Sequence, residues 1–468
     1  MNKTSFFWHD YETFGRDPRQ DRPAQFAGVR TDLELQEIAE PVMAYCQPAP
    51  DHLPDPESCL LTGITPQVCA AQGLAEHAFA EVVHAELSRE GTVGVGYNSI
   101  KFDDEVTRFL LWRCLLDPYA REWQNQCGRW DLLNVVRCAF AFRPETLEWP
   151  RHPDGRPSLK LEHLCRANGV VHDQAHDALS DVRATLALGR LIKQRSPRLW
   201  EFCLGLRDKH KVMAEMSTGG PFWHVSGMYG ADRGCLAMVW PLAPHPFHKN
   251  EVIVWDLSQD PGLLQGLPPL QIRERLFTPR DQWPSGLERL PIKTIHINQS
   301  PVVVGQLKTL TPALAQRWGV DVDQCLRHAE RLAAAQNDTS LWRAVFERPN
   351  LATRDVDQDL YGGLITSQDR RTLERLRQEA PRRAVQASFE DERLDELLFR
   401  YRARNFPQTL SGEERARWRL HCIAVLGPKE AYLSRLELAR GTSEASTGTK
   451  LVDALAAHAE LLFAAAGS

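Results

Sequence analysis

The chain has 468 residues, enough for about three domains that each bury a core of their own. Its formal net charge of −5 excludes a protein that is basic overall, so any nucleic-acid surface must be a local basic groove. The 11 cysteines lie singly, without C-x-x-C spacing, which argues against a zinc or disulfide scaffold and predicts a reduced, cytoplasmic protein with buried thiols. We expect no N-terminal signal peptide, and we expect no membrane span because the sequence has no 18-residue apolar run.

Two carboxylates lie at the end of the first predicted strand, Phe6–Asp10. Side chains alternate along a strand, so Asp10 and Glu12 are expected on the same face. Two anions this close repel each other unless a cation neutralises them, and the pair therefore suggests a divalent-metal site. On its own, D-x-E also fits a solvated strand end or a turn.

A third carboxylate is expected where a helix begins. The apolar residues after Thr92 predict a short buried strand, and Asp103 stands at the start of an apolar-periodic helix. The next two residues, Asp104 and Glu105, fit the acidic first turn that helix capping favours.

A histidine and a fourth carboxylate flank the start of another predicted helix, Ala178–Lys193. His176 and Asp181 are five residues apart, which corresponds to about 500° of rotation on a regular helix. They would therefore not share a helical face. This favours Asp181 as a metal ligand, with His176 on a separate and more mobile approach.

The three patterns D-x-E, N-x-x-x-F-D and H-x-x-x-x-D occur in this order in fewer than 200 residues. Together they resemble the DEDD superfamily of 3′ to 5′ exonucleases, histidine subclass. A closer similarity, to the bacterial exodeoxyribonuclease I family, extends over nearly the whole chain. It is carried by HDYETFG, DRPAQFA, LTGITP, FDDEVTR and HDALSD, and beyond the nuclease part by HVSGMYG and YRARNFP.

The resemblance implies a catalytic set of five residues. Four of them are implied as ligands of two Mg²⁺ ions, which Mn²⁺ could replace: Asp10, Glu12, Asp103 and Asp181. Carboxylate oxygens suit these hard cations, and no thiolate lies in the motifs to favour zinc. His176 is implied as the general base, because an imidazole with an ordinary pKa of about 6.5 can be neutral at working pH.

Strand and helix patterns alternate in the first 200 residues. The further expected strands are Gln25–Arg30, Pro41–Tyr45 and Thr92–Gly96, and the further helices are Ala75–Leu87, Asp104–Leu116, Leu132–Phe142 and Leu159–Ala167. Residues Phe222 to Val304 are rich in β-branched and aromatic residues, and Leu314–Gln336 returns to helix. After a linker at Glu347–Asp359 the chain is helical, with helices expected at Asp391–Arg404, Gly412–Ala424 and Leu451–Ala466.

The fold implied by the resemblance has three parts. An α/β ribonuclease-H-like nuclease domain (1–200) is followed by a β-rich SH3-like domain with helices (201–350) and an all-helical C-terminal domain (351–468). In the family architecture, the second and third domains close over the nuclease cleft.

Residues that would contact a DNA strand are also implied by the resemblance. They are Arg108, Tyr119, Trp123, Arg137 and Lys160, together with Glu12. For Tyr119 and Trp123, packing in the core is an equal alternative, since large aromatic residues are buried on average. Lys160 stands where the family has Arg, so it keeps the charge without a bidentate phosphate grip. The three arginines of YRARNFP favour a structural role, with Glu392 and Asp395 as acidic neighbours.

The implied activity is Mg²⁺-dependent 3′ to 5′ hydrolysis of single-stranded DNA to 5′-mononucleotides, in DNA repair and recombination. The implied partner is the C-terminal tail of single-stranded DNA-binding protein, and a monomer is expected. Two alternatives stay open. The first is an exoribonuclease that trims RNA 3′ ends, because the metal site does not distinguish the sugars. The second is a DNA-binding scaffold with a dead nuclease site.

Overall fold

The computed structural model describes most of the chain in two compact units. The described residues are 4–172, 176–284, 286–334, 339–347, 354–378, 387–442 and 446–467. The first unit comprises Met1–Gly128, His172–Leu186 and Thr353–Ser468, and the second comprises Arg129–Val171 and Ala187–Ala352. The N-terminal and C-terminal parts of the chain therefore belong to the same unit.

Four strands of a mixed sheet lie in the first unit. Their order is β3 (Val42–Tyr45), β2 (Pro23–Thr31), β1 (Ser5–Thr13) and β4 (Thr92–Gly96). β1 runs antiparallel to β2 and parallel to β4. All four strands confirm the sequence prediction. β1 is longer than predicted, and its extra residues bring Glu12 into the sheet.

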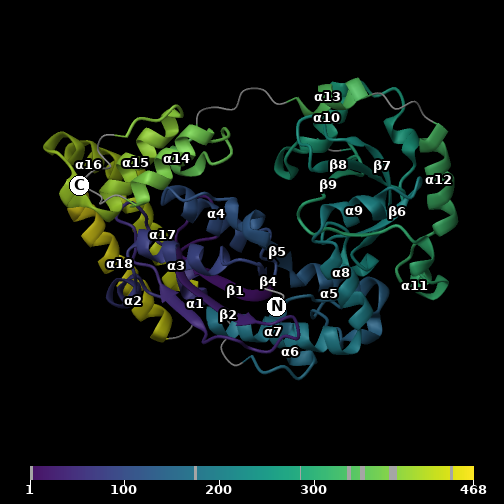
Figure 1. Ribbon diagram of the computed structural model, residues 1–468, viewed down its shortest axis with the longest axis horizontal. Coiled ribbons are helices and arrows are strands. Elements are labelled where there is room, and N and C mark those ends of the chain that lie inside the picture. Colours follow the sequence, from purple (N-terminus) through teal and green to yellow (C-terminus); the bar gives the residue numbers. More distant parts are fainter. Residues whose placement is uncertain are drawn as a thin grey trace. The chain divides into compact units, whose positions relative to one another are not determined.

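The two faces of β1 have different neighbours. Odd-numbered side chains such as Phe7 and Tyr11 share a buried cluster with residues of α3 (Glu76–Leu87) and α4 (Asp103–Arg113). Because side chains alternate, Asp10 and Glu12 point to the opposite face. Figure 1 shows α3 and α4 on one side of β1 and β2, and α7 (Ala178–Arg195) on the other.

Helices from the C-terminal part of the chain share a core with the N-terminal part. α1 (Pro56–Thr62) and α2 (Pro66–Gln72) pack against α17 (Lys429–Thr442) and α18 (Ser446–Ala466), as Figure 1 also shows. The hydroxyl of Tyr432 donates to the backbone carbonyl of Pro54, just before α1, over 2.8 Å. The other helices of the C-terminal part are α14 (Ser367–Gln378), α15 (Glu392–Asn405) and α16 (Gly412–Leu426).

Buried ion pairs join α15 to Asp51, just before α1, and to Asp357, just before α14. The Arg404 guanidinium contacts Asp51 at 2.6 Å and Asp357 at 2.5 Å, and all three side chains are almost fully buried. Arg400 pairs with Asp355 and Asp357. The arginines of YRARNFP therefore have the structural role that the sequence favours.

Their partners differ from the expected ones. Arg402 pairs with Glu414 at 2.7 Å, and Arg400 pairs with Glu396 on its own helix at 2.8 Å, rather than with Glu392 or Asp395. The buried partners Asp51 and Asp357 lie far away in sequence, so the local pattern could not identify them.

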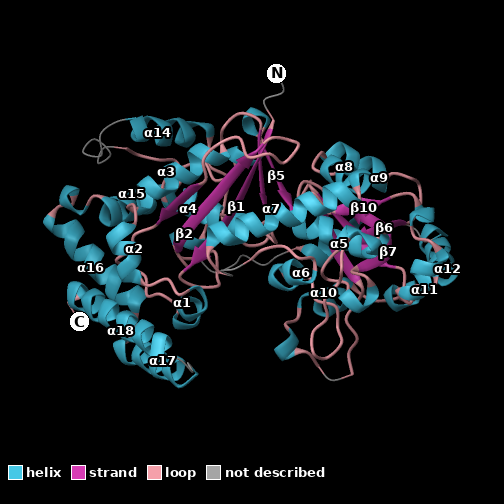
Figure 2. Cartoon of the chain, turned by 90° about the horizontal axis from the view of Figure 1, so that it is seen from below, coloured by secondary structure: helices cyan, strands magenta, loops and turns pink. Residues whose placement is uncertain are grey.

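An antiparallel sheet forms the centre of the second unit. Its order is β10 (Val302–Val304), β6 (Phe222–Val225), β7 (Leu236–Pro244), β8 (Glu251–Asp256) and β9 (Ile292–His296), as predicted for the β-rich region. Figure 2 shows these strands in magenta among helices. The helices are α5 (Leu132–Phe142), α6 (Leu161–Ala167), α8 (Pro197–Gly205), α9 (Lys209–Met216), α10 (Pro269–Phe277), α11 (Pro312–Arg317), α12 (Val322–Ala334) and α13 (Thr339–Phe346).

Two expectations about the whole chain can be compared with the structure. All 11 cysteines are free and buried, as predicted. Within the described ranges, no helix is both long enough and apolar enough to span a membrane.

Candidate active site

The first two acidic residues of the site are fixed by the central strand. Asp10 and Glu12 are two residues apart on β1, and Glu12 is buried, with 8% of its surface exposed. The backbone N–H of Tyr11, between them, donates to Oδ1 of Asp103 over 3.2 Å. Asp103 is the first residue of α4, so this bond brings the third predicted carboxylate beside the first two.

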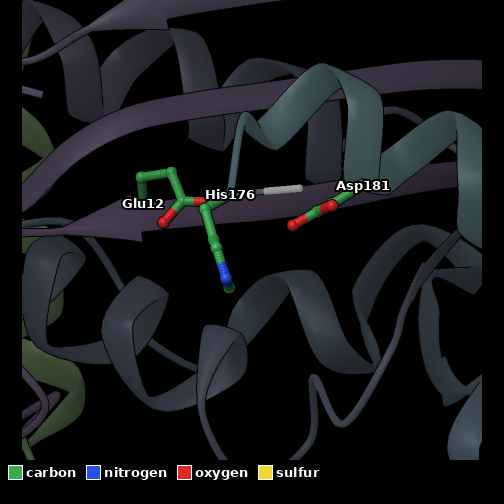
Figure 3. A group of neighbouring side chains, drawn as sticks. All are labelled: Glu12, His176 and Asp181. Carbon is green, nitrogen blue, oxygen red and sulfur yellow. The ribbon is translucent and has the colours of Figure 1, made fainter. Parts of the chain in front are cut away.

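His176 and Asp181 approach the same strand from the start of α7. His176 lies just before the helix with a φ of 69°, a left-handed conformation that turns the chain into the helix. The ligand atoms of Glu12, His176 and Asp181 all lie within 4.8 Å of one another. Figure 3 shows Glu12 on its strand beside His176 and Asp181.

The five predicted catalytic residues are thus brought together in one region. Sequence spacing predicted that His176 and Asp181 could not share a helical face, and the structure explains how they still meet. His176 is outside the regular helix, so the 3.6-residue period does not apply to it.

Burial raises the pKa of three carboxyl groups in the cluster. Burial is the main reason that the pKa of Asp10 lies well above its usual value, and three neighbouring carboxylates add to the shift: Asp103, Glu12 and Asp181. Burial, followed by the charges of Asp181 and Asp177, raises the pKa of Glu12 to about 8. Burial also raises the pKa of Asp181.

These properties fit a divalent cation. Hard carboxylate oxygens are the ligands that such ions prefer, and a cation among them would remove the repulsion that raises their pKa values. Asp10, Glu12, Asp103 and Asp181 would hold it. His176 offers a nitrogen at the edge of the same cluster.

A second histidine at the site was missed by the sequence analysis. Nε2 of His172 lies 2.5 Å from Oδ1 of Asp181, and the His172 side chain is almost fully buried. A hydrogen bond from this imidazole would orient the carboxylate, as outer partners of metal ligands commonly do. The only signal was a second histidine four residues before His176, and that spacing alone does not distinguish a partner of a metal ligand from an ordinary loop residue.

Three of the predicted strand contacts lie in the first unit. Arg108 is buried and makes two bonds to the Glu122 carboxylate, of 2.7 and 2.9 Å, and its guanidinium also lies over the Tyr119 ring. Tyr119 is partly buried against an apolar cluster. Trp123 is 64% exposed, so its ring is available to a ligand. All three remain predictions as strand contacts.

The other two predicted strand contacts belong to the second unit. Arg137 donates to Asn134 on its own helix over 3.1 Å, and its guanidinium closely approaches Gly227. Lys160 occupies the position just before α6 and makes no side-chain capping bond, and 65% of its side chain is exposed. These two also remain predictions.

Three family models match consecutive parts of the chain. The model described as "Exonuclease" matches residues 7–188, "Exonuclease I SH3-like domain" matches 207–348, and "Exonuclease I C-terminal domain" matches 354–462. The first of these spans all five residues of the cluster.

Two curated relatives match over most of their length. Exodeoxyribonuclease I of Escherichia coli (strain K12) is 43% identical over 444 residues, which are 93% of each chain. Exodeoxyribonuclease I of Haemophilus influenzae is 41% identical over 422 residues, which are 89% of each chain.

Solved structures agree with the fold. Exonuclease I from Methylocaldum szegediense has a TM-score of 0.91 at 46% identity, covering 98% of this chain and 99% of its own. E. coli exonuclease I in complex with a dA16 oligonucleotide has a TM-score of 0.92 at 42% identity, covering 98% and 100%. A zinc-bound complex of the E. coli enzyme with single-stranded DNA has a TM-score of 0.92 at 41% identity, with the same coverage.

The mixed sheet and its cluster of carboxylates and histidine define an exonuclease whose site is built for divalent metal ions. Within that class, the chain belongs to the exodeoxyribonuclease I family. It has the α/β exonuclease, SH3-like and helical C-terminal domains expected from its sequence.

Proposed function

We propose that this protein hydrolyses single-stranded DNA from the 3′ end and releases 5′-mononucleotides. The observation that carries the proposal is the convergence of Glu12, His176 and Asp181 within 4.8 Å at the face of β1 that also bears Asp10. The proposed role is in DNA repair, which is general for the family, and in recombination.

The metal ions are proposed to be two Mg²⁺, with Mn²⁺ as a substitute. When bound, two such ions lower the pKa of an attacking water and offset the charge that develops on the phosphate. The ligands are Asp10, Glu12, Asp103 and Asp181. Their oxygen-only donor set is the support for Mg²⁺ over softer metals.

His176 is proposed to accept the proton of the attacking water. Its position before α7 leaves the imidazole outside the helix, next to the carboxylates and about half buried. An imidazole has the proton affinity required of a general base near neutral pH. Glu12 also faces this space, and it is proposed to contact the terminal nucleotide.

DNA is favoured over RNA by the relatives. E. coli exonuclease I was solved with dA16 and with dT13 oligonucleotides. Binding a single strand requires aromatic faces and cations directed at phosphates. The exposed ring of Trp123 could supply a stacking surface, and Arg108, Tyr119, Arg137 and Lys160 are the further proposed contacts.

Further proposals concern partners and setting. We propose that exposed Arg and Lys side chains bind the acidic C-terminal tail of single-stranded DNA-binding protein. The protein is proposed to act in the cytoplasm as a monomer, with domain boundaries near residues 200 and 350. Coprecipitation with a synthetic tail peptide, with a charge-reversed peptide as control, tests the partner.

The experiment for the activity uses 5′-labelled DNA and RNA oligomers of one sequence. With Mg²⁺ or Mn²⁺, the DNA should shorten from its 3′ end, and a chelator should stop the reaction. Faster shortening of the RNA would favour an exoribonuclease. Binding without any shortening would favour the dead-nuclease scaffold.

A further inference from the structure

Gln25 is a buried amide on the strand next to the metal ligands. It lies on β2 directly opposite Glu12 in the antiparallel register, and only 1% of its surface is exposed. Residues paired in this way point to the same face of a sheet. The Gln25 side chain is therefore directed to the face that carries the acidic cluster.

Both ends of the Gln25 amide bind the start of α7. Its Nε2 donates to Oδ1 of Asp177 over 3.1 Å, and its Oε1 accepts the backbone N–H of Ala178 over 3.1 Å. A backbone N–H can only donate, so the amide orientation is fixed by the second bond. Nε2 also lies 3.3 Å from the hydroxyl of Tyr45 on β3.

Asp177 connects this amide to the helix. Its other carboxylate oxygen accepts the backbone N–H of Ser180 over 3.1 Å, which is a helix-capping bond. Its backbone carbonyl accepts the N–H of Asp181 over 3.0 Å. Asp177 thus stands between His176 and Asp181 and is bonded to the turn that holds both.

We infer that Gln25 is a positioning residue that sets the distance of His176 and Asp181 from Glu12. Gln25 joins β2, at the position opposite Glu12, to the start of α7, where His176 and Asp181 lie. Because a shift of about 1 Å in catalytic groups can reduce rates about 100-fold, this link controls the chemical step rather than the binding of the strand. The inference rests on the proposed nuclease function.

The test exchanges the amide of Gln25 and the carboxylate of Asp177, which are hydrogen-bonded to each other. Gln25→Glu places two carboxylates face to face and removes the donor, and Asp177→Asn removes a charge and leaves two amides. In the double variant, the amide introduced at position 177 can donate to the carboxylate introduced at position 25. That carboxylate still accepts the Ala178 N–H, and the total charge equals that of the unaltered chain.

Each single variant is expected to lose about 10- to 100-fold in kcat, with KM for a short DNA strand changed less than about threefold. The double variant should recover most of the loss. Gln36→Glu, on an exposed turn after β2, is the matched control and should retain full activity. Thermal melting of all variants separates a loss of fold from a loss of positioning.

Two results would overturn the inference. One is a single variant that stays folded with unchanged kcat. The other is a double variant, also folded, whose loss in kcat is the product of the two single losses, because a restored hydrogen bond must produce coupling. If the unaltered protein itself does not cleave DNA, the proposed function fails instead, and the two failures are distinguished.

Discussion

The backbone N–H of Tyr11 donates to the Asp103 carboxylate, so strand β1 and helix α4 are joined where their acidic residues meet. The two residues are 92 positions apart in the sequence. The bond brings Asp103 beside Asp10, whose pKa is raised first by burial and then by the charge of Asp103. Ionised carboxylates this close together repel one another and destabilise the folded protein. A bound divalent cation would relieve that repulsion.

Removing a metal ligand should abolish turnover without unfolding the protein. For Asp10→Asn and Asp181→Asn, we expect kcat to fall by more than about 100-fold, because a ligand matters at least as much as the groups that orient it. Glu40→Gln, at an exposed position, is the control for a lost acidic charge. Single-turnover assays on short DNA measure the effect, and near-normal hydrolysis by either folded variant would refute the ligand assignment.

Asp10→Asn should stabilise the metal-free protein. Burial and neighbouring charges raise the pKa of Asp10, so its contribution to stability is lost as pH rises from the unfolded value through the folded value. In chelator at pH 8, Asp10→Asn should therefore melt a few degrees above the unaltered chain. Adding Mn²⁺ should raise the melting temperature of the unaltered chain more than that of the variant. An Asn variant that melts lower in chelator would contradict this.

Replacing the proposed base should slow chemistry and change its pH dependence. His176→Ala is expected to reduce kcat by about 10²- to 10⁴-fold, with strand binding retained. Only a neutral imidazole can accept a proton, so the rate of the unaltered chain should have an acidic limb, in which the rate falls as the pH decreases. That limb should be absent in the variant. His210→Ala, with an exposed side chain, is the control, and persistence of the acidic limb in His176→Ala would identify another base.

Breaking the buried ion pairs of α15 should destabilise the first unit. Arg404→Met leaves the carboxylates of Asp51 and Asp357 without their main cation, which costs about 3 to 5 kcal/mol for a buried pair. Arg419→Gln, on the exposed part of α16, should have almost no effect. Urea unfolding at pH 7 measures the difference, and equal stability of the two variants would contradict the role of the pairs.

The stabilisation by the Arg404–Asp51 ion pair should decrease as the pH falls. The charge of Arg404 and a hydrogen bond from His421 hold the pKa of Asp51 well below its usual value despite burial. The stabilisation is thus present above the unfolded pKa, near 4, and is lost as pH falls toward the folded value. The stability gap between the unaltered chain and Arg404→Met should narrow in acid.

Much of the first unit could be predicted from local patterns. Period-two alternation and apolar runs predicted the strands, and the family resemblance carried by D-x-E, Asp103 and H-x-x-x-x-D implied the acidic cluster. What the sequence could not provide was contact between distant segments. The core shared by Cys59 and Tyr432, and the pairing of Asp51 with Arg404, join residues more than 350 positions apart.

Short and irregular elements were also missed. α1 and α2 have only 7 residues each, too few for a clear helical period, and each begins with Pro after a capping residue. α10 lies inside the region predicted to be β-rich, because the prolines before it fit a break in a sheet as well as the start of a helix. His172 and Gln25 were overlooked because their partners are set by the fold, not by spacing.

The most direct test of the central claim follows the oxygen of the attacking water. A single-stranded DNA with a distinct 3′-terminal nucleotide is digested in H₂¹⁸O with Mg²⁺, and the products are examined by mass spectrometry over time. We expect the terminal nucleotide to appear first, as a 5′-monophosphate with one ¹⁸O on its phosphate, and we expect chelator or Asp181→Asn to prevent its release. Release that begins at the 5′ end, or products that carry a 3′-phosphate, would contradict it.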